Sequence, residues 1–189
     1  MSQFKSNQTN LWAWAGWRGR RPMGKTLGPT LGPTWGHVLG LALAMGLAGS
    51  AQGAEHMRKN AYQTDRAFSP GVVTEGGKTV WLAGSSALKD AQGNDIAYQF
   101  DAQLRRVWEQ IDETLALQGG RLKDVVTITV YLLDPRLGDK VVASRKALWP
   151  DGRYPGSALI TVSNFAKPGI LVEIQAVAVI GDRRAEVAP

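Results

Sequence analysis

Glu173 is the residue of this sequence whose setting best suits acid–base chemistry. It lies in LVEIQAVAVI, residues 171–180, where nearly every neighbouring side chain is apolar. Burial disfavours the charged form of a carboxylate, so a buried glutamate can exchange protons near neutral pH and act as a general acid or base. The alternative is a carboxylate at a wet subunit interface, hydrogen-bonded to Gln175 or to a threonine. The spacing favours neither interpretation over the other.

Histidine, cysteine and phosphate-loop chemistry are poorly supported by the composition. The chain has two histidines and no cysteine, and only His56 follows the N-terminal leader described below. We expect His56 to lie in a flexible stub, residues 55–65. Histidine-based triads and His/Cys zinc sites are thereby excluded, and we expect no metal. The glycine pairs at 76–77 and 119–120 lack the strand-to-helix setting of a nucleotide-binding loop and are interpreted as turns.

Arg153 and three tryptophans are further side chains that could contact a ligand. Arg153 precedes Tyr154 in a loop that leads into a strand, where a cation could meet an anionic ligand. The competing interpretation is a solvated loop arginine. The tryptophans are interpreted as core or interface anchors rather than as a stacking platform for bases. They are Trp81, Trp108 and Trp149.

An export signal is predicted at the N terminus. Residues 1–54 hold five of the 22 basic residues and none of the 16 acidic ones. Within them, the uncharged apolar run at 38–48 is too short for a membrane span of about 20 residues but is typical of a signal-peptide core. Small residues permit cleavage after Gly53 or Ala54, and Met23 begins a more typical leader. We therefore expect a periplasmic or secreted protein without a stable membrane span, the alternative being a retained anchor or a disordered tail.

The charge of the remaining chain argues against a nucleic-acid partner. Residues 55–189 carry the other seventeen basic residues against all 16 acidic ones, a net charge of about +1. The sequence pI of about 9.8 therefore reflects mainly the leader, and the folded part lacks the basic excess of a nucleic-acid-binding domain.

Hydrophobic periodicity predicts a single α/β (α+β) domain over residues 66–181, followed by a C-terminal tail at 182–189. The element order is ββαβαββ, a mixed sheet with two helices on one face. The first two strands are expected to form a hairpin about the glycine pair at 76–77. The expected strands are 66–75, 79–84, 124–133, 157–165 and 171–180, and the expected helices are 95–118 and 137–149.

Alternation along three strands predicts a sheet face that is polar but poor in charge. The polar side chains fall on one side of each strand and are expected to share the face away from the helices. Such a face suits an interface between subunits. Its expected members are Thr127, Thr129, Tyr131, Thr161, Ser163, Glu173 and Gln175. The opposite face of the long helix 95–118, with Asp101, Arg105, Glu109 and Asp112, is expected to be solvated.

Three segments resemble the Rid (reactive intermediate deaminase) family, also called the endoribonuclease L-PSP family. They are FSPGVV with TVWLAG, GRLKDVVTITVYLLD, and YPGSALITVSNFAKPGILVEIQAVAV, and together they cover roughly residues 66–180. The resemblance implies a chorismate-mutase-like fold and a homotrimer with a central barrel and clefts between subunits. It also implies hydrolysis of enamines and imines without any cofactor.

The same resemblance assigns roles to individual residues. Glu173 matches the acidic residue that positions the attacking water. Phe68 stands at the family's aromatic position, and Gly84 with Ser85 at its Ser-Gly-Gln segment. Ser157 stands where the family's arginine grips the substrate carboxylate. Arg153 lies four residues away, some 13 Å in an extended strand, too far to substitute unless the loop folds back.

These residues lead to three functional hypotheses. The first is an exported Rid-like trimer that binds or hydrolyses a small enamine- or imine-type molecule in its inter-subunit clefts, with weak activity on 2-imino acids and Glu173 as the proton-handling residue. The second is a true enamine/imine deaminase with a different carboxylate grip. The third is a non-catalytic ligand-binding or chaperone-like envelope protein.

Overall fold

The computed structural model describes residues 54–181. The predicted leader up to residue 53 and the predicted tail at 182–189 lie outside the described residues. No helix within the described part combines the length and apolar character needed to cross a membrane.

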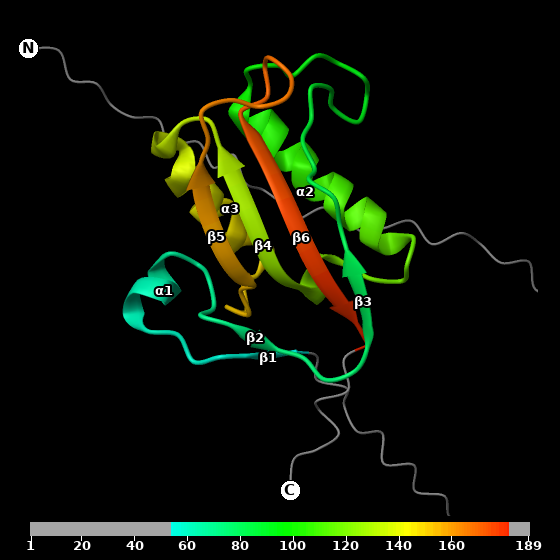
Figure 1. The fold of residues 1–189 in the computed structure, drawn as a ribbon, viewed down its shortest axis with the longest axis vertical. Helices are drawn as coiled ribbons and strands as arrows, with labels where there is room; N and C mark the ends of the chain where they lie inside the picture. The colour runs from blue at the N-terminus through cyan, green and yellow to red at the C-terminus, as the bar shows by residue number, and fades with distance from the viewer. Residues whose placement is uncertain (1–53, 182–189) are drawn as a thin grey trace, which may run out of the picture. The chain divides into compact units, whose positions relative to one another are not determined.

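The core of the domain is a mixed four-stranded sheet (Figure 1). In order across the sheet, the strands are β3 (Lys78–Trp81), β6 (Val172–Ile180), β4 (Val125–Leu132) and β5 (Gly156–Thr161). Strand β6 runs antiparallel to β3 and β4, whereas β4 and β5 are parallel. Parallel neighbours need a crossover connection, and α3 (Gly138–Leu148) supplies it.

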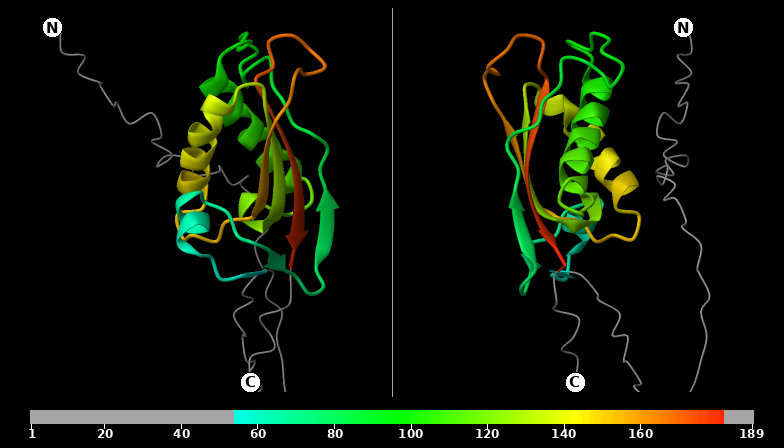
Figure 2. Two further views of the ribbon diagram at one scale, coloured as in Figure 1. Left: turned by 60° about the vertical axis from the view of Figure 1, so that its left-hand side comes forward. Right: turned by 90° about the vertical axis from the view of Figure 1, so that its right-hand side faces the viewer.

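Two helices cover one face of this sheet and leave the other face open (Figure 2). They are α3 and the longer α2 (Phe100–Ala116), with the short 3-10 helices η1 (Leu122–Asp124) and η2 (Pro135–Leu137) at their flanks. The apolar stripe predicted for a helix over 95–118 is buried throughout, but the helix is shorter than predicted, because α2 begins at Phe100 and Ile96 precedes it. The stripe consists of Ile96, Phe100, Leu104, Val107, Trp108, Ile111 and Leu115.

Two of the three tryptophans anchor the core beneath the helices. Trp108 meets Trp149 edge to face with ring centroids 5.7 Å apart. Its indole N–H donates to Ser144 Oγ at 3.2 Å, so the buried polar atom is satisfied. Trp81 differs, since it is 79% exposed and lies on the open face of the sheet.

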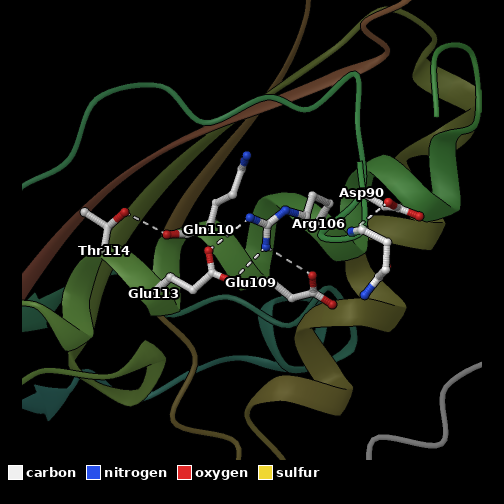
Figure 3. A network of polar contacts seen from close by, with 7 residues as sticks. Asp90, Arg106, Glu109, Gln110, Glu113 and Thr114 are labelled. Atoms are coloured by element: carbon white, nitrogen blue, oxygen red, sulfur yellow. Dashed lines mark hydrogen bonds and ion pairs between the residues drawn. The ribbon is translucent and has the colours of Figure 1, made fainter. Parts of the chain in front are cut away.

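The outer face of α2 carries paired charges. Figure 3 shows Arg106 between Glu109 and Glu113, with a fork of hydrogen bonds of 2.8 and 3.0 Å to Glu113. The expectation of a solvated Asp112 is wrong. Asp112 is only 8% exposed, and its carboxylate accepts from the backbone N–H of Leu122 at 2.9 Å. That bond ties the helix to the turn that follows it.

The flexible stub expected at residues 55–65 is instead regular structure. The segment contains β1 (Glu55–His56) and α1 (Ala61–Asp65), and a capping box formed by Asn60 and Gln63 begins the helix. A two-residue strand and a five-residue helix are too short to show hydrophobic periodicity, so the pattern could not predict them.

The predicted hairpin between the first two β-rich runs does not form. Strand β2 (Val72–Val73) pairs with β1 in a separate two-stranded sheet, and β3 pairs with β6. Gly76 and Gly77 have φ of 77° and 71°, a left-handed conformation that suits glycine, and they make the turn that leads into β3.

The open face of the sheet carries some, but not all, of the polar residues predicted for it. Tyr131 lies opposite Glu173, and Thr129 lies opposite Gln175, so these residues share a face. Thr161 does not belong to that face, because it pairs with Leu132, a side chain buried under the helices. Ile160 takes the expected place opposite Tyr131. Ser163 lies beyond the end of β5.

Candidate functional site

Glu173, Gly84 and Ser85 form one cluster at the β3–β6 side of the sheet. Ser85 exchanges two backbone hydrogen bonds with Ile174, of 2.8 and 3.0 Å, which fixes the segment after β3 beside β6. The carboxylate of Glu173 lies directly against Gly84. A Cβ placed on Gly84 would approach the carboxyl carbon of Glu173 to 2.9 Å. The missing side chain of the glycine therefore makes room for this carboxylate.

The carboxylate oxygens of Glu173 are uncommitted within the described part of the chain. The side chain is half-buried and forms no hydrogen bond or ion pair with another described residue, so the alternative of a bond to Gln175 or to a threonine is not realised there. A carboxylate with open acceptor sites can orient a water molecule and take its proton.

Phe68 and Ser157 belong to a second cluster, at the β5 side. Ser69 donates its backbone N–H to Pro155 at 3.1 Å and forms a bridge to Gly156, so residues 68–69 run alongside the start of β5. The ring of Phe68 meets Tyr62 edge to face at 6.1 Å.

Arg145 joins this second cluster and was missed in the sequence. It donates to Ser157 Oγ at 2.5 Å and to the carbonyl of Arg66 at 3.0 Å. The residue is 2% exposed. Burial, with a smaller contribution from the nearby positive charge of Arg66, lowers the pKa of Arg145 to about 10. A signal existed, because Arg145 falls four residues after Val141 on the buried stripe of α3.

Arg153 and His56 fix the N-terminal segment to the rest of the domain. Arg153 does not reach Ser157. Arg153 donates to the carbonyl of Ala54 at 2.8 Å. His56 Nδ1 lies 2.8 Å from the carbonyl of Tyr154, which also accepts from Ser69 Oγ at 2.6 Å. Burial lowers the pKa of His56 from its ordinary value. The histidine is thus part of an ordered contact. Its Nδ1 and the hydroxyl of Ser69 lie 3.5 Å apart, and the shorter contact of each atom is to the carbonyl of Tyr154 rather than to the other.

Comparison with known proteins identifies the family. The family model for endoribonuclease L-PSP matches residues 58–180, which is more than half of the chain. The chain belongs to this family, the Rid family. Membership supports a role in small-molecule binding or in deamination, and Rid proteins are typically homotrimeric.

Two solved structures show the same fold. The protein of unknown function YyfB of the conserved Rid family from Yersinia pestis has 24% identity and a TM-score of 0.61, and the match covers 68% of this chain and all of YyfB. The related YyfA from the same organism has 18% identity and a TM-score of 0.50, covering 67% of this chain and 99% of YyfA. The mixed α+β, chorismate-mutase-like Rid fold is confirmed.

The two clusters of this Rid domain do not meet within one chain. Glu173 lies on the open face, opposite Tyr131. Ser157 lies opposite Ile128, so it faces the helix side of the sheet. The structure therefore brings together Gly84, Ser85 and Glu173, and separately Phe68 and Ser157, with Arg153 in neither cluster. Among residues 54–181, no group of three or more acidic or histidine side chains could hold a metal ion.

Proposed function

We propose that this Rid protein is an exported homotrimer whose inter-subunit clefts bind and hydrolyse a small enamine- or imine-type molecule. The observation that carries the proposal is the Glu173 carboxylate, held against Gly84 with its oxygens uncommitted within the described residues. Its position on the open sheet face gives a bound water and a ligand access to it.

The separation of the two clusters supports a site shared between subunits. Side chains on opposite faces of one sheet cannot contact the same small molecule, so a second copy is needed to bring a Ser157 cluster near a Glu173 cluster. The open face has an exposed apolar anchor for such an assembly in Trp81, and β5 exposes Leu159 and Ile160.

Hydrolysis of an imine needs one group that accepts and returns protons. Glu173 takes a proton from water as the water oxygen bonds to the imine carbon, and it returns that proton to the imine nitrogen to give a carbinolamine. The hydroxyl proton then passes to nitrogen and the carbon–nitrogen bond breaks. A carbonyl compound and ammonia leave, and Glu173 is regenerated as the carboxylate.

Ammonia release tests this assignment. The substrate is an imine generated in the assay by an amino-acid oxidase, and the enzyme is the wild-type chain or Glu173→Gln. The imine formed by this oxidase is a 2-imino acid, on which we expect wild type to accelerate ammonia release only weakly. We expect Glu173→Gln to lose that acceleration, because general acid–base catalysis contributes about 10²- to 10⁴-fold to a rate. Binding of a carbonyl ligand without any acceleration would instead support the non-catalytic alternative.

The export part of the proposal rests on the apolar run at 38–48 and the acid-free leader around it. N-terminal sequencing of protein from the cell envelope is expected to begin at Ala54 or Glu55. A cytoplasmic product that retains residues 23–53 would contradict it.

A further inference from the structure

Tyr131 is the polar side chain next to Glu173 on the neighbouring strand of the open face. It stands directly opposite Glu173 in the register of β4 and β6, which lie side by side in the sheet (Figure 1). Side chains at such opposite positions have Cβ atoms about 4.5–5.5 Å apart. On its other side Glu173 lies against Gly84, which has no side chain to offer. The phenol of Tyr131 is therefore the second group that can do proton chemistry at this position.

The hydroxyl of Tyr131 is available to a ligand. The side chain is half-buried, and it forms no hydrogen bond with another described residue. Its two opposite neighbours are Glu173 on β6 and Ile160 on β5, and Ile160 is apolar. A tyrosine hydroxyl both donates and accepts hydrogen bonds, and a phenol that leaves water usually finds a partner. A molecule bound on the open face can supply that partner.

The hydroxyl and the carboxylate suit the two ends of one chemical bond. A tyrosine that stands perpendicular to the sheet carries its hydroxyl farther from the backbone than a glutamate carries its carboxylate. A small molecule beside Glu173 can then contact both groups at once. Addition of water to an imine needs a base at the water oxygen and an acid at the nitrogen, which is bonded to the carbon that the water attacks. A carboxylate and a phenol at adjacent positions meet this requirement.

We propose that Tyr131 is a catalytic residue that acts as the general acid toward the imine nitrogen, while Glu173 acts as the base toward water. The inference rests on the proposed function and deepens it. With Glu173 alone, one carboxylate must take a proton from water and deliver the same proton to nitrogen. With Tyr131 beside it, the first proton that reaches nitrogen comes from the phenol.

The two groups exchange roles in the second half of the reaction. In the first step the water oxygen bonds to the imine carbon and Glu173 takes a proton from the water. The electron pair of the carbon–nitrogen π bond takes the hydroxyl proton of Tyr131, which gives a carbinolamine. In the second step protonated Glu173 gives its proton to the amine nitrogen, and the tyrosinate takes the hydroxyl proton of the carbinolamine. The carbon–nitrogen bond breaks as the carbonyl forms, ammonia leaves, and both side chains return to their starting states.

Tyr131→Phe tests this role, because it removes the hydroxyl and keeps the ring. The imine is generated in the assay from a primary amine by an amine oxidase, so it carries no carboxylate. The measured quantity is ammonia release above the uncatalysed rate, as a function of imine concentration. We expect Tyr131→Phe to lower kcat by about 10²-fold or more, the effect of removing a general acid. KM should stay within about twofold, because the proton is transferred only in the transition state.

Two matched variants control for the loss of a hydroxyl elsewhere. Thr129→Val removes a hydroxyl from the same strand and the same face, at the position opposite Gln175 instead of Glu173. Tyr98→Phe makes the same chemical change as Tyr131→Phe at a residue that is 70% exposed. We expect both variants to keep the wild-type kcat. Light scattering on each sample confirms that its subunit composition matches wild type.

A second measurement keeps the test decisive if Tyr131→Phe fails to fold or to assemble. Replacing Tyr131 with 3,5-difluorotyrosine preserves its shape and makes the hydroxyl more acidic. A general acid must carry its proton, so the rate declines at alkaline pH as the hydroxyl ionises. The fluorinated side chain should move that decline to lower pH. A tyrosine that only fills space at an interface would leave the profile unchanged, which would overturn the inference.

Each outcome separates this inference from the proposed function. A Tyr131→Phe protein with the wild-type kcat, or with no larger loss than Thr129→Val, overturns the inference. Glu173-dependent ammonia release would then still support the proposed function, with Glu173 making both proton transfers. A raised KM with unchanged kcat would make the hydroxyl a binding group only, and the inference would be wrong. If wild type releases no ammonia above the uncatalysed rate from either kind of imine, both fall.

Discussion

Substituting Gly84 with alanine tests whether the position of the Glu173 carboxylate carries the chemistry. The new Cβ would come within 2.9 Å of the Glu173 carboxyl carbon and closer still to Oε1. Ordinary contacts between such atoms are about 3.5–4 Å, so the carboxylate must move by the order of 1 Å. A displacement of that size at a catalytic group can cost about 10²-fold in rate.

The same substitution should have little effect on folding. Gly84 is not among the residues with positive φ, so alanine fits its backbone and stabilises by about 0.4–1 kcal/mol through the unfolded state. Moving a half-exposed side chain off its rotamer costs about 0.5–1.5 kcal/mol. The two effects nearly cancel, and we expect the free energy of unfolding to change by less than about 1 kcal/mol.

Ammonia release and urea unfolding measured on the same sample check both halves of this prediction. Gly138→Ala is the matched control, because its Cβ would meet only Leu159 at 3.8 Å, an ordinary contact, and it begins a helix far from Glu173 in the chain. Adding Glu173→Gln to Gly84→Ala should cause no loss beyond that of Glu173→Gln alone. A Gly84→Ala protein with the wild-type rate would refute the assigned role of the carboxylate.

Three further predictions concern the assembly and the N-terminal contact. Trp81→Asp should convert the trimer to a monomer in light scattering. Leu117→Asp, at an equally exposed position after α2, is the control and should leave the trimer intact. A trimeric Trp81→Asp protein would exclude the open face as the interface. Because the chain has no cysteine, a double variant with Ser85→Cys and Ser157→Cys should give covalent dimers and trimers when it is treated with a short bis-maleimide. Neither single variant should be cross-linked. If the double variant gives intrachain products alone, the shared cleft is contradicted. The pKa of His56 is lower in the folded chain than its ordinary value of 6.5. Between these two pKa values the unfolded chain therefore binds more protons than the folded chain. The contribution of the His56 contact to the free energy of unfolding is complete above pH 6.5 and is lost as the pH falls toward the folded-state pKa. The decrease should vanish in His56→Gln, and an unchanged acid limb in urea unfolding of that variant would show that His56 is not its cause.

The sequence predicts the fold best where a long periodic run of apolar residues packs against one buried surface. Six apolar residues at helical spacing leave one orientation for α2, and all six are buried. Alternation likewise placed Tyr131 and Glu173 on one face. It failed for Thr161, because β5 is an edge strand exposed on both sides, where alternation does not distinguish the faces.

The parts of the site that the sequence did not reveal depend on contacts between distant segments. His56 is ordered by the carbonyl of Tyr154, 98 positions away. Arg145 was overlooked because a charged residue in a helix is usually solvated. Its position four residues after Val141 indicates the buried face of α3, but only the structure shows that Arg145 is buried and that Ser157 is its partner.

The edge of the sheet at β5 connects the assembly with the ligand site. Beyond the bridge between Ser69 and Gly156, the outer edge of β5 is unpaired with any described strand, and Leu159 and Ile160 are exposed there. Unpaired apolar edges promote association, and proteins usually cover them. A second copy that covers this edge approaches to about the 4.8 Å spacing of neighbouring strands. It would then lie next to Ser157, so in the proposed assembly the exposed edge that a second copy would cover and this side chain of the proposed cleft are at the same place.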